Sequence, residues 1–312
     1  MPSSGFILRR LLQLIPTLIF IFVVTFVIVR LLPGDPTSAI LGDRATDADV
    51  ERINRNLGLD KSIPVQFLVF VERILQGDLG SSINLKAPVL DLILQRMPVT
   101  LLLTGMAALI ALALAVPLAF IAALKRDRPA DNVIRGAFQV GLSTPVFYLG
   151  LVLLTIFAAR LRWFPVGGFG DTFAEHLYHL FLPALTLALS LAAVLMRNLR
   201  AAILEVIGAE YITFARSKGL SPRLVLTRHV LRNALISTVA LFGLSIGTLL
   251  GGAVITETVF AIPGVGRLMI ESIYGRDYPV IQGLTLVLAV FVSLVFLVTD
   301  IVQAALDPRI GR

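Results

Sequence analysis

Six long apolar stretches decide what this sequence can fold into. They occupy residues 11–32, 99–124, 134–158, 180–203, 234–256 and 283–306. At about 1.5 Å of rise per residue, each is long enough as a helix to cross a hydrocarbon layer of roughly 30 Å. The chain is 57% hydrophobic and 15% charged, whereas soluble domains carry about 25% charged residues. These features exclude a soluble enzyme, a disordered chain and a coiled coil, and predict an all-α polytopic membrane protein.

The basic residues indicate how the six spans are oriented. If the N-terminus is cytoplasmic, the internal segments are 1–10, 125–135, 197–232 and 307–312, and they carry 15 Lys and Arg against 5 Asp and Glu. The external segments, Arg30 included, carry 12 basic and 14 acidic residues. Basic residues concentrate in cytoplasmic loops. The N- and C-termini are therefore both predicted to be cytoplasmic, and the net charge of +7 reflects topology rather than nucleic-acid binding.

Three regions follow from this topology. Residues 1–32 form an N-terminal tail and the first span, which we expect to be an uncleaved anchor because no small-x-small cleavage site follows it. Residues 33–98 form a small external cap with helical stretches from Asp47 to Leu57 and from Val65 to Gln76. Residues 99–312 form a five-helix core that includes an internal loop, 204–232.

Several kinds of chemistry are missing from the sequence. It has no cysteine, which excludes disulfides, thiol catalysis and zinc-thiolate sites. His176 and His179 have a spacing that suits a metal, but no clear third ligand accompanies them, so no metal site is predicted. No convincing Ser/His/Asp or paired-carboxylate arrangement is present, and the chain is not interpreted as an enzyme.

The internal loop 204–232 is the most informative segment. Gly219 suits the residue just beyond a first short helix, because glycine accepts the left-handed conformation. Ser221 as N-cap and Pro222 at the first helical position predict a second helix. Two functions fit the loop: a basic amphipathic helix resting on anionic lipid, or a docking surface that the small residues Ala215 and Gly219 let a partner approach closely. Five cations make the loop basic: Arg216, Lys218, Arg223, Arg228 and Arg232.

The loop also resembles the cytoplasmic coupling loop of binding-protein-dependent ABC importers. Glu210-Tyr211, Ala215-Arg216 and Lys218-Gly219-Leu220-Ser221 match the form found in peptide importers, while Thr213, Phe214 and Arg232 depart from the more general signature. Further matches run in order along the chain: Leu32-Pro-Gly-Asp-Pro36, Gly77-Asp-Leu-Gly-x-Ser82, Glu257-Thr-Val-Phe, Pro263-Gly-Val-Gly-Arg-Leu268, Arg276-Asp277-Tyr278-Pro279-Val280 and Asp307-Pro308-Arg309. The chain is similar to the first permease subunit of dipeptide, oligopeptide and nickel importers.

This resemblance implies a type I ABC importer permease fold in a bacterial inner membrane. It implies as partners a second homologous permease chain, two cytoplasmic ATPases and an extracytoplasmic binding protein. The chain has no Gly-x-x-x-x-Gly-Lys-Ser/Thr phosphate loop, so ATP and Mg²⁺ are expected on the ATPases and no cofactor is expected on this chain. The coupling residues would be Glu210, Tyr211, Ala215, Arg216, Lys218, Gly219, Leu220, Ser221 and Arg223.

The resemblance leaves the substrate and its path open. Peptides are the favoured cargo, with nickel complexes, glutathione, opines and oligosaccharides as alternatives. Pathway candidates are Ser143, Asn233, Ser245 and Thr248, although Ser and Thr in spans also serve as packing and hydrogen-bonding residues. A transporter driven by an ion gradient is less favoured, because it would need paired charges near the bilayer midplane and Asp300 is the one acid within a span.

Overall fold

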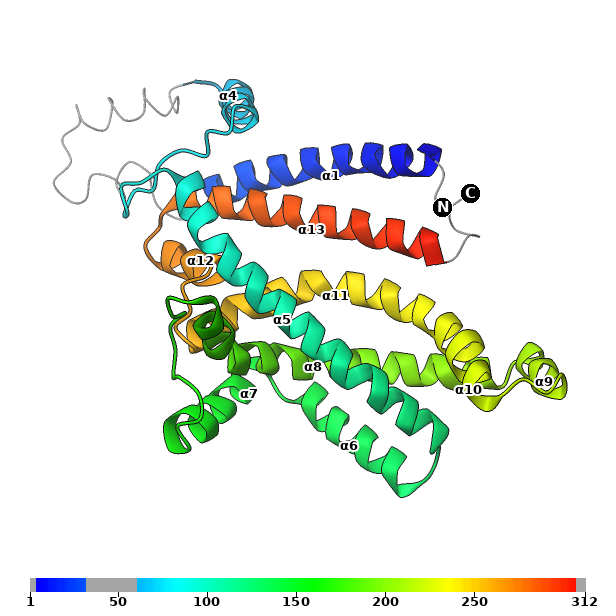
Figure 1. Ribbon diagram of the computed structural model, residues 1–312. Coiled ribbons are helices and arrows are strands. Elements are labelled where there is room, and N and C mark those ends of the chain that lie inside the picture. Colours follow the sequence, from blue (N-terminus) through cyan, green and yellow to red (C-terminus); the bar gives the residue numbers. More distant parts are fainter. Residues whose placement is uncertain (1–3, 32–60, 307–312) are drawn as a thin grey trace.

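The computed structural model describes residues 4–31 and 61–306, and within these ranges every regular element is a helix (Figure 1). The first predicted span is α1 (Ser4–Leu31), and the described part of the external cap contains α4 (Ile63–Leu75). The second span is α5 (Val89–Leu124), which begins before the predicted start at 99. The expected cap helix from Asp47 to Leu57 lies outside the described residues.

The third predicted span is two helices rather than one. α6 (Pro129–Ser143) and α7 (Val146–Leu153) are bent by 106° at a short break, and a π-helical segment, η2 (Leu154–Arg160), continues α7. Five other helices among the described residues are long and apolar enough to cross a membrane, if α10 and α11 are taken as one continuous helix. The structure therefore has five candidate spans, or six if the bent pair counts as one. The predicted number of spans therefore holds only with a broken third span.

The remaining helices complete the core and its two ends. α8 (Phe173–Ile207) is the fourth span, and α9 (Glu210–Ser217) and α10 (Pro222–Leu224) follow it. A π-helical segment, η3 (Val225–Leu231), joins α10 to α11 (Arg232–Val259). α12 (Val265–Tyr274) and α13 (Tyr278–Leu306) end the described chain.

α8 lies at the centre of the core, and small side chains let α5 pack closely against it. Its first turn is fixed by a capping box, in which the Glu175 amide donates to Thr172 Oγ1 and the Thr172 amide donates to Glu175 Oε2. The contact between α5 and α8 is the most extensive between any two described helices. Alanines at intervals of four residues form one buried ridge on each helix: Ala107, Ala111, Ala115 and Ala119 on α5, and Ala184, Ala188 and Ala192 on α8. Such ridges allow close backbone approach within a membrane.

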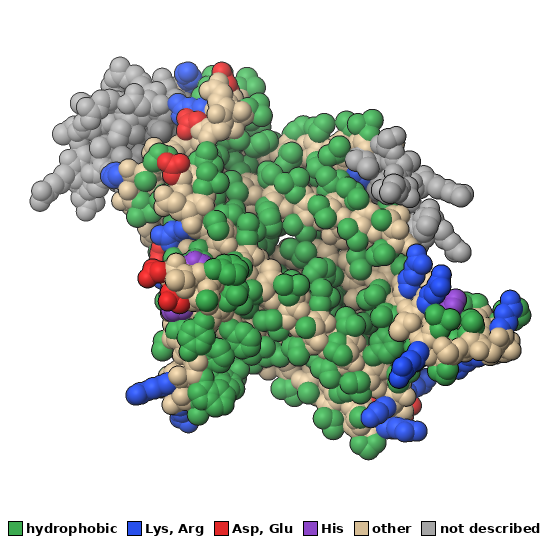
Figure 2. Space-filling model, in the orientation of Figure 1, with side chains coloured by type: hydrophobic (Ala, Val, Ile, Leu, Met, Phe, Trp, Pro, Cys, Tyr) green, Lys and Arg blue, Asp and Glu red, His purple; other side chains and the backbone are tan. Residues whose placement is uncertain are grey.

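The two ends of the helix bundle differ in charge. The start of α1, the end of α13 and the α9–α10 segment lie at one end, whereas α12 and the start of α13 lie at the other (Figure 1). On the face drawn in Figure 2, Lys and Arg gather around the first end, Asp and Glu gather toward the second, and the middle is hydrophobic. This distribution agrees with the charge asymmetry of the predicted loops. At the basic end, Arg10 on α1 forms an ion pair with Asp300 on α13, with 3.2 Å between Nε and Oδ2.

At the acidic end, a buried carboxylate holds the start of α12. The Thr100 hydroxyl on α5 donates to Glu257 Oε1 at 2.5 Å, and the Arg267 amide donates to Glu257 Oε2 at 3.0 Å. Thr100 Oγ1 in turn accepts from the Val265 amide at 3.0 Å. A Cβ at Gly264 would overlap the Glu257 carboxylate. The glycine therefore gives Glu257 room to cap α12 from a different helix.

A second buried carboxylate at this end joins two motifs that are far apart in sequence. Asp277 Oδ2 accepts from the Ser82 hydroxyl at 2.5 Å and from the Asn84 amide at 3.1 Å. The Ile83 amide donates to Asp277 Oδ1 at 3.1 Å. Asp277 is almost fully buried. The segment that follows α4 is thereby fixed to the turn between α12 and α13.

Candidate functional site

The segment between α8 and α11 contains the predicted coupling loop and lies at the basic end of the bundle. α8 ends at Ile207, and the chain turns at Gly208, whose amide donates to the carbonyls of Leu204 and Glu205. α9 begins directly after this turn. Only Gly208 and Ala209 therefore separate α9 from the central helix of the core.

Gly219 ends α9 in the conformation that the sequence predicts. Its φ is +78°, and its amide donates to the Arg216 carbonyl at 2.9 Å. The Leu220 amide donates back to the Ala215 carbonyl at 3.4 Å. These two bonds form the Schellman arrangement that satisfies the last carbonyls of a helix. A Cβ added at Gly219 would meet nothing within 4 Å, so within this chain the glycine is required for its backbone conformation and not for space.

The second predicted helix begins as expected but does not end within the loop. Ser221 caps it, with the Leu224 amide donating to Ser221 Oγ at 3.4 Å, and Pro222 occupies the first helical position. α10 then continues through η3 directly into α11. The expected separate helix is therefore the N-terminal end of the fifth span, so α9 and the fifth span are joined by the short turn around Gly219.

Ala215 lies on the buried face of α9 and not on an exposed face, where the docking role would place it. Ala215 is only 7% exposed and belongs to the same hydrophobic cluster as Ile212, Val225 and Val230. α9 packs on η3. The small side chain of Ala215 therefore allows close packing within this chain, and it is not available to a partner on the outer face.

The outer face of α9 is aromatic and basic. Phe214 is 61% exposed and Tyr211 is 46% exposed. Lys218 Nζ lies 4.5 Å from the centroid of the Phe214 ring, a cation–π contact. An open groove of about 620 Å³ runs along this face. Its lining residues are Gly208, Glu210, Tyr211, Thr213, Phe214 and Ser217.

Four further predicted coupling residues are not among those that line the groove. Arg216, Ser221 and Arg223 are exposed, and Leu220 is half-buried. Among the described residues, Arg216 and Arg223 have no carboxylate within ion-pair distance. Within the part of the chain that the structure describes, the outer face of α9 and its neighbours therefore present positive charge without a carboxylate partner, beside exposed aromatic rings.

The four predicted pathway residues do not gather in one place. Asn233 lies at the start of α11, where its Nδ2 donates to the Tyr211 hydroxyl of α9 at 3.2 Å and to the His229 carbonyl at 2.6 Å. Ser245 and Thr248 each donate to a carbonyl of α11 itself. Ser143 is exposed at the break between α6 and α7. Asn233 therefore ties α9 to α11, and the hydroxyls of Ser245 and Thr248 are satisfied within their helix.

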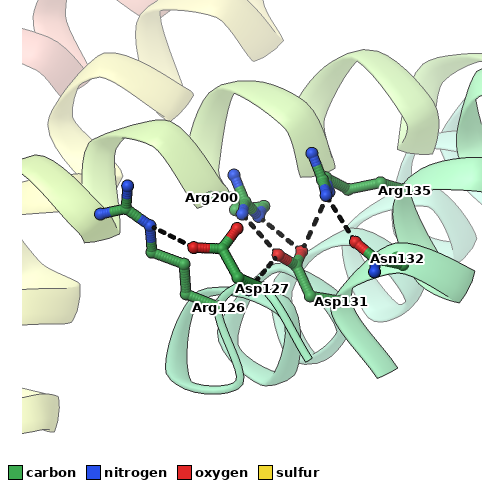
Figure 3. Close-up of polar contacts among 6 residues, drawn as sticks. All are labelled: Arg126, Asp127, Asp131, Asn132, Arg135 and Arg200. Carbon is green, nitrogen blue, oxygen red and sulfur yellow. Dashed lines mark hydrogen bonds and ion pairs between the residues drawn. The ribbon is translucent and has the colours of Figure 1, made fainter. Parts of the chain in front are cut away.

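Sequence reasoning missed a cluster of charged residues at the start of α6 (Figure 3). Asp131 is fully buried and accepts two hydrogen bonds from Arg200 of α8, from Nε at 2.8 Å and from Nη2 at 2.7 Å. The Asp127 amide and the Arg135 guanidinium also contact the Asp131 carboxylate. An acid at the third position of α6, two residues after the proline that begins the helix, is the local signal that could have indicated it. Arg200 lies in the last two turns of α8, the helix that leads into α9. This cluster therefore joins the broken span to that helix.

The two histidines at the acidic end each contact a backbone carbonyl through Nδ1. His176 Nδ1 lies 2.9 Å from the Phe169 carbonyl, and His179 Nδ1 lies 2.9 Å from the Gly167 carbonyl. Within residues 4–31 and 61–306, no group of three or more His, Asp or Glu side chains is arranged to hold a metal ion. Both rings therefore fix the loop that precedes α8.

Comparison with known families covers nearly the whole chain. Residues 4–104 match the N-terminal region, and residues 115–312 the main region, of the family described as binding-protein-dependent transport system inner membrane component. The chain is 41% identical over 306 residues to a glutathione transport system permease protein of Pectobacterium atrosepticum, and the match covers 98% of each protein.

Two further relatives have comparable identity. A probable D,D-dipeptide transport system permease protein of Escherichia coli is 40% identical, with 93% of this chain and 92% of that protein covered. An oligopeptide transport system permease protein of Bacillus subtilis is 38% identical, with 98% and 99% covered.

The fold has counterparts among solved structures. An inward-facing structure of the MetNI methionine ABC transporter contains a chain that superposes with a TM-score of 0.58 at 18% identity, covering 69% of this chain and 96% of that chain. A chain of an amino acid ABC transporter superposes with a TM-score of 0.54 at 17% identity, covering 69% and 94%. At these identities the likeness concerns the fold alone.

Proposed function

The chain belongs to the family of binding-protein-dependent transport system inner membrane components, and from this premise we propose that it forms, with a second homologous permease chain, the pathway by which short peptides enter the cell. Membership makes it a multi-pass inner-membrane permease subunit and not itself an enzyme. It also makes an ATPase and a substrate-binding protein its partners. The fully described α5, α8, α11 and α13 supply the apolar spans that such a subunit needs.

The substrates named for the relatives share one kind of chemistry, and this supports a peptide as the substrate of this chain. The three named above are described as transporting glutathione, D,D-dipeptides and oligopeptides. All three cargoes are short chains of amino acids joined by amide bonds. The matches cover more than nine-tenths of each protein, so the resemblance extends over the spans as well as the loops.

Uptake by the purified complex tests the substrate. The two permease chains and the ATPases are reconstituted in liposomes, and the loaded binding protein is added on the side opposite the ATPases. ATP is supplied on the ATPase side. The import of labelled dipeptides, tripeptides and pentapeptides is then measured. Glutathione is included among the tripeptides. We expect ATP-dependent import of at least one of the three peptide classes. Import of only nickel complexes, opines or oligosaccharides would overturn the peptide assignment and leave the permease assignment intact.

The outer face of α9 is proposed as the surface that receives the ATPase. Its exposed Phe214 and Tyr211, the groove beside them and the unpaired cations Arg216 and Arg223 suit a partner with an apolar cleft and acidic rim. ATP and Mg²⁺ would be bound by the ATPases, and closure of those subunits would push on α9. The purified chain alone is accordingly expected to hydrolyse no ATP.

Disulfide crosslinking tests this surface, because the chain contains no cysteine of its own. Phe214→Cys should crosslink to a cysteine placed in the cleft of the ATPase. Arg128→Cys, exposed at the same end but away from α9, serves as the matched control and should not crosslink. Equal crosslinking at both positions, or none at Phe214→Cys in an assembled complex, would contradict docking on this face.

A further inference from the structure

The break between α6 and α7 leaves main-chain polar groups without partners among the described residues. Thr144 is extended, with φ −89° and ψ 125°, as expected of a residue before a proline. Pro145 has no N–H, so the Gly141 carbonyl loses its helical donor. Among the described residues, neither side of the break finds a substitute. The unpaired groups are the carbonyls of Gly141, Leu142 and Ser143 and the amides of Val146, Phe147 and Tyr148.

Along the length of the membrane-spanning bundle, the break lies near the middle and not at either end. A Cβ on Gly141 would lie 3.9 Å from the Leu189 carbonyl, and Leu189 is near the midpoint of α8. Helix ends that occur at the membrane surface have their free carbonyls and amides hydrated. At this depth a lipid environment offers no such hydration, and each unsatisfied group costs several kcal/mol.

The side chains around the break are polar and unpaired as well. Gln139 and Ser143 are both exposed, and neither makes a side-chain hydrogen bond within the described residues. Tyr148 is 56% exposed, and its hydroxyl likewise has no described partner. Thr144 differs, because its hydroxyl donates to the Val140 carbonyl at 2.7 Å. Polar side chains and free backbone groups are thus concentrated on one exposed face of the broken span.

Irregular backbone at membrane depth is tolerated where it is covered by protein or lines a water-filled cavity. A dry protein surface would have to place a matched donor or acceptor against every one of these backbone groups and three side chains. Water meets all of them without such a match, since each molecule both donates and accepts. The number and variety of unpaired groups therefore favour a wet passage over a dry contact.

We propose that the Ser143–Pro145 break lines the water-filled translocation pathway, with Gln139, Ser143 and Tyr148 as side chains that touch the passing substrate. The inference rests on the proposed function only for the existence of a pathway between two permease chains. A peptide carries a carbonyl and, except at proline, an amide at each residue. The free carbonyls of residues 141–143 can accept from its amides as water is displaced, so the break suits an amide-bonded cargo.

Thiol accessibility in the complete complex tests the proposal. Ser143→Cys and Gln139→Cys are treated with a charged, membrane-impermeant thiol reagent, and Leu109→Cys, 71% exposed on the unbroken α5, is the control. The thiolate is the reactive species and forms only where water reaches it. We expect Ser143→Cys and Gln139→Cys to react roughly tenfold or more faster than Leu109→Cys. When the complex imports peptide, we also expect Ser143→Cys and Gln139→Cys to be labelled more slowly. The labelling rate of the exposed loop variant Arg128→Cys should stay unchanged.

The outcomes separate this inference from the proposed function. If Ser143→Cys and Gln139→Cys react no faster than Leu109→Cys in resting, ATP-bound and turning-over complexes that import peptide, the break is dry and the inference is wrong. Labelling of the break without any peptide import would instead support a wet passage and count against the peptide assignment. Should Ser143→Cys fail to assemble, Gln139→Cys lies one helical turn earlier and decides the question by itself.

Discussion

Asp131 and Arg200 form a fully paired, two-point ion pair between α6 and α8, although they are 69 residues apart in the sequence. The Asp131 carboxylate is completely buried, and the Arg200 side chain is 16% exposed. Two parallel N–H to oxygen bonds fix the relative direction of the two helices as well as their distance. The beginning of the broken third span is thereby held to the helix that leads into α9.

Removing one partner of this pair should strongly destabilise the folded chain. Asp131→Ala leaves the Arg200 guanidinium without its carboxylate in a largely buried site, and loss of one partner of a buried pair costs about 3–5 kcal/mol. We expect a lower midpoint of thermal unfolding for the detergent-solubilised complex. Arg200→Ala should have an effect of similar size, because it leaves the buried Asp131 carboxylate with only the Asp127 amide and the Arg135 guanidinium as described partners.

The matched control is the neighbouring pair Arg126–Asp127, which is also drawn in Figure 3. Its side chains are 66% and 75% exposed. Exposed pairs contribute about 0–1 kcal/mol, so Arg126→Ala should leave the unfolding midpoint nearly unchanged. Similar midpoints for Asp131→Ala and Arg126→Ala would show that the buried pair does not hold the two helices together.

The Glu257 network at the opposite end gives a second stability prediction. Glu257→Ala removes the acceptor of the Thr100 hydroxyl and of the Arg267 amide, and each buried group left unsatisfied costs about 1–3 kcal/mol. We expect a clearly lower unfolding midpoint. Glu271→Ala is the control, since the Glu271 side chain is 47% exposed and its partners among residues 4–31 and 61–306 are arginine side chains. An unchanged midpoint in Glu257→Ala would mean that α12 is held by its apolar contacts alone.

The sequence indicates the spans because hydrocarbon imposes a length and a composition on each helix. It also indicates the Gly219 turn and the Ser221-Pro222 start, since both depend on residues within a few positions of one another. It does not indicate the break before Pro145. Pro98, Pro117 and Pro183 lie inside continuous helices, so a proline in an apolar stretch does not by itself distinguish a tolerated kink from a break.

The sequence also does not indicate which residues far apart in the chain contact one another. Ser82 and Asp277 each belong to a motif matched by the family resemblance, yet nothing local to either motif indicates that the hydroxyl donates to the carboxylate. The same holds for Ala215, whose small size was interpreted as room for a partner. Ala215 shares a buried cluster with Val225 and Val230 of η3, and nothing within α9 itself indicates that packing.

The conformation of Gly219 gives a prediction about coupling. Gly219→Val places a β-branched residue at positive φ, which costs roughly 1–2 kcal/mol and should disorder the turn between α9 and α10. We expect normal membrane insertion but weaker co-purification of the ATPases and slower uptake. Gly219→Asn is the matched control, because asparagine accepts the left-handed region. Wild-type uptake by Gly219→Val would show that the position of α9 is unimportant for transport.

Orientation in the membrane can be tested with single cysteines, because the chain contains none of its own. Asp171 and Arg276 are exposed in loops at the acidic end of the bundle, and Arg128 and Arg223 are exposed at the basic end. The excess of basic residues at the basic end predicts that this end is cytoplasmic. An impermeant thiol reagent added to intact spheroplasts should therefore label Asp171→Cys and Arg276→Cys but neither Arg128→Cys nor Arg223→Cys. Permeabilised cells should label all four, which controls for side-chain access. Labelling of Arg223→Cys in sealed spheroplasts would invert the topology and place the α9 groove out of reach of a cytoplasmic ATPase.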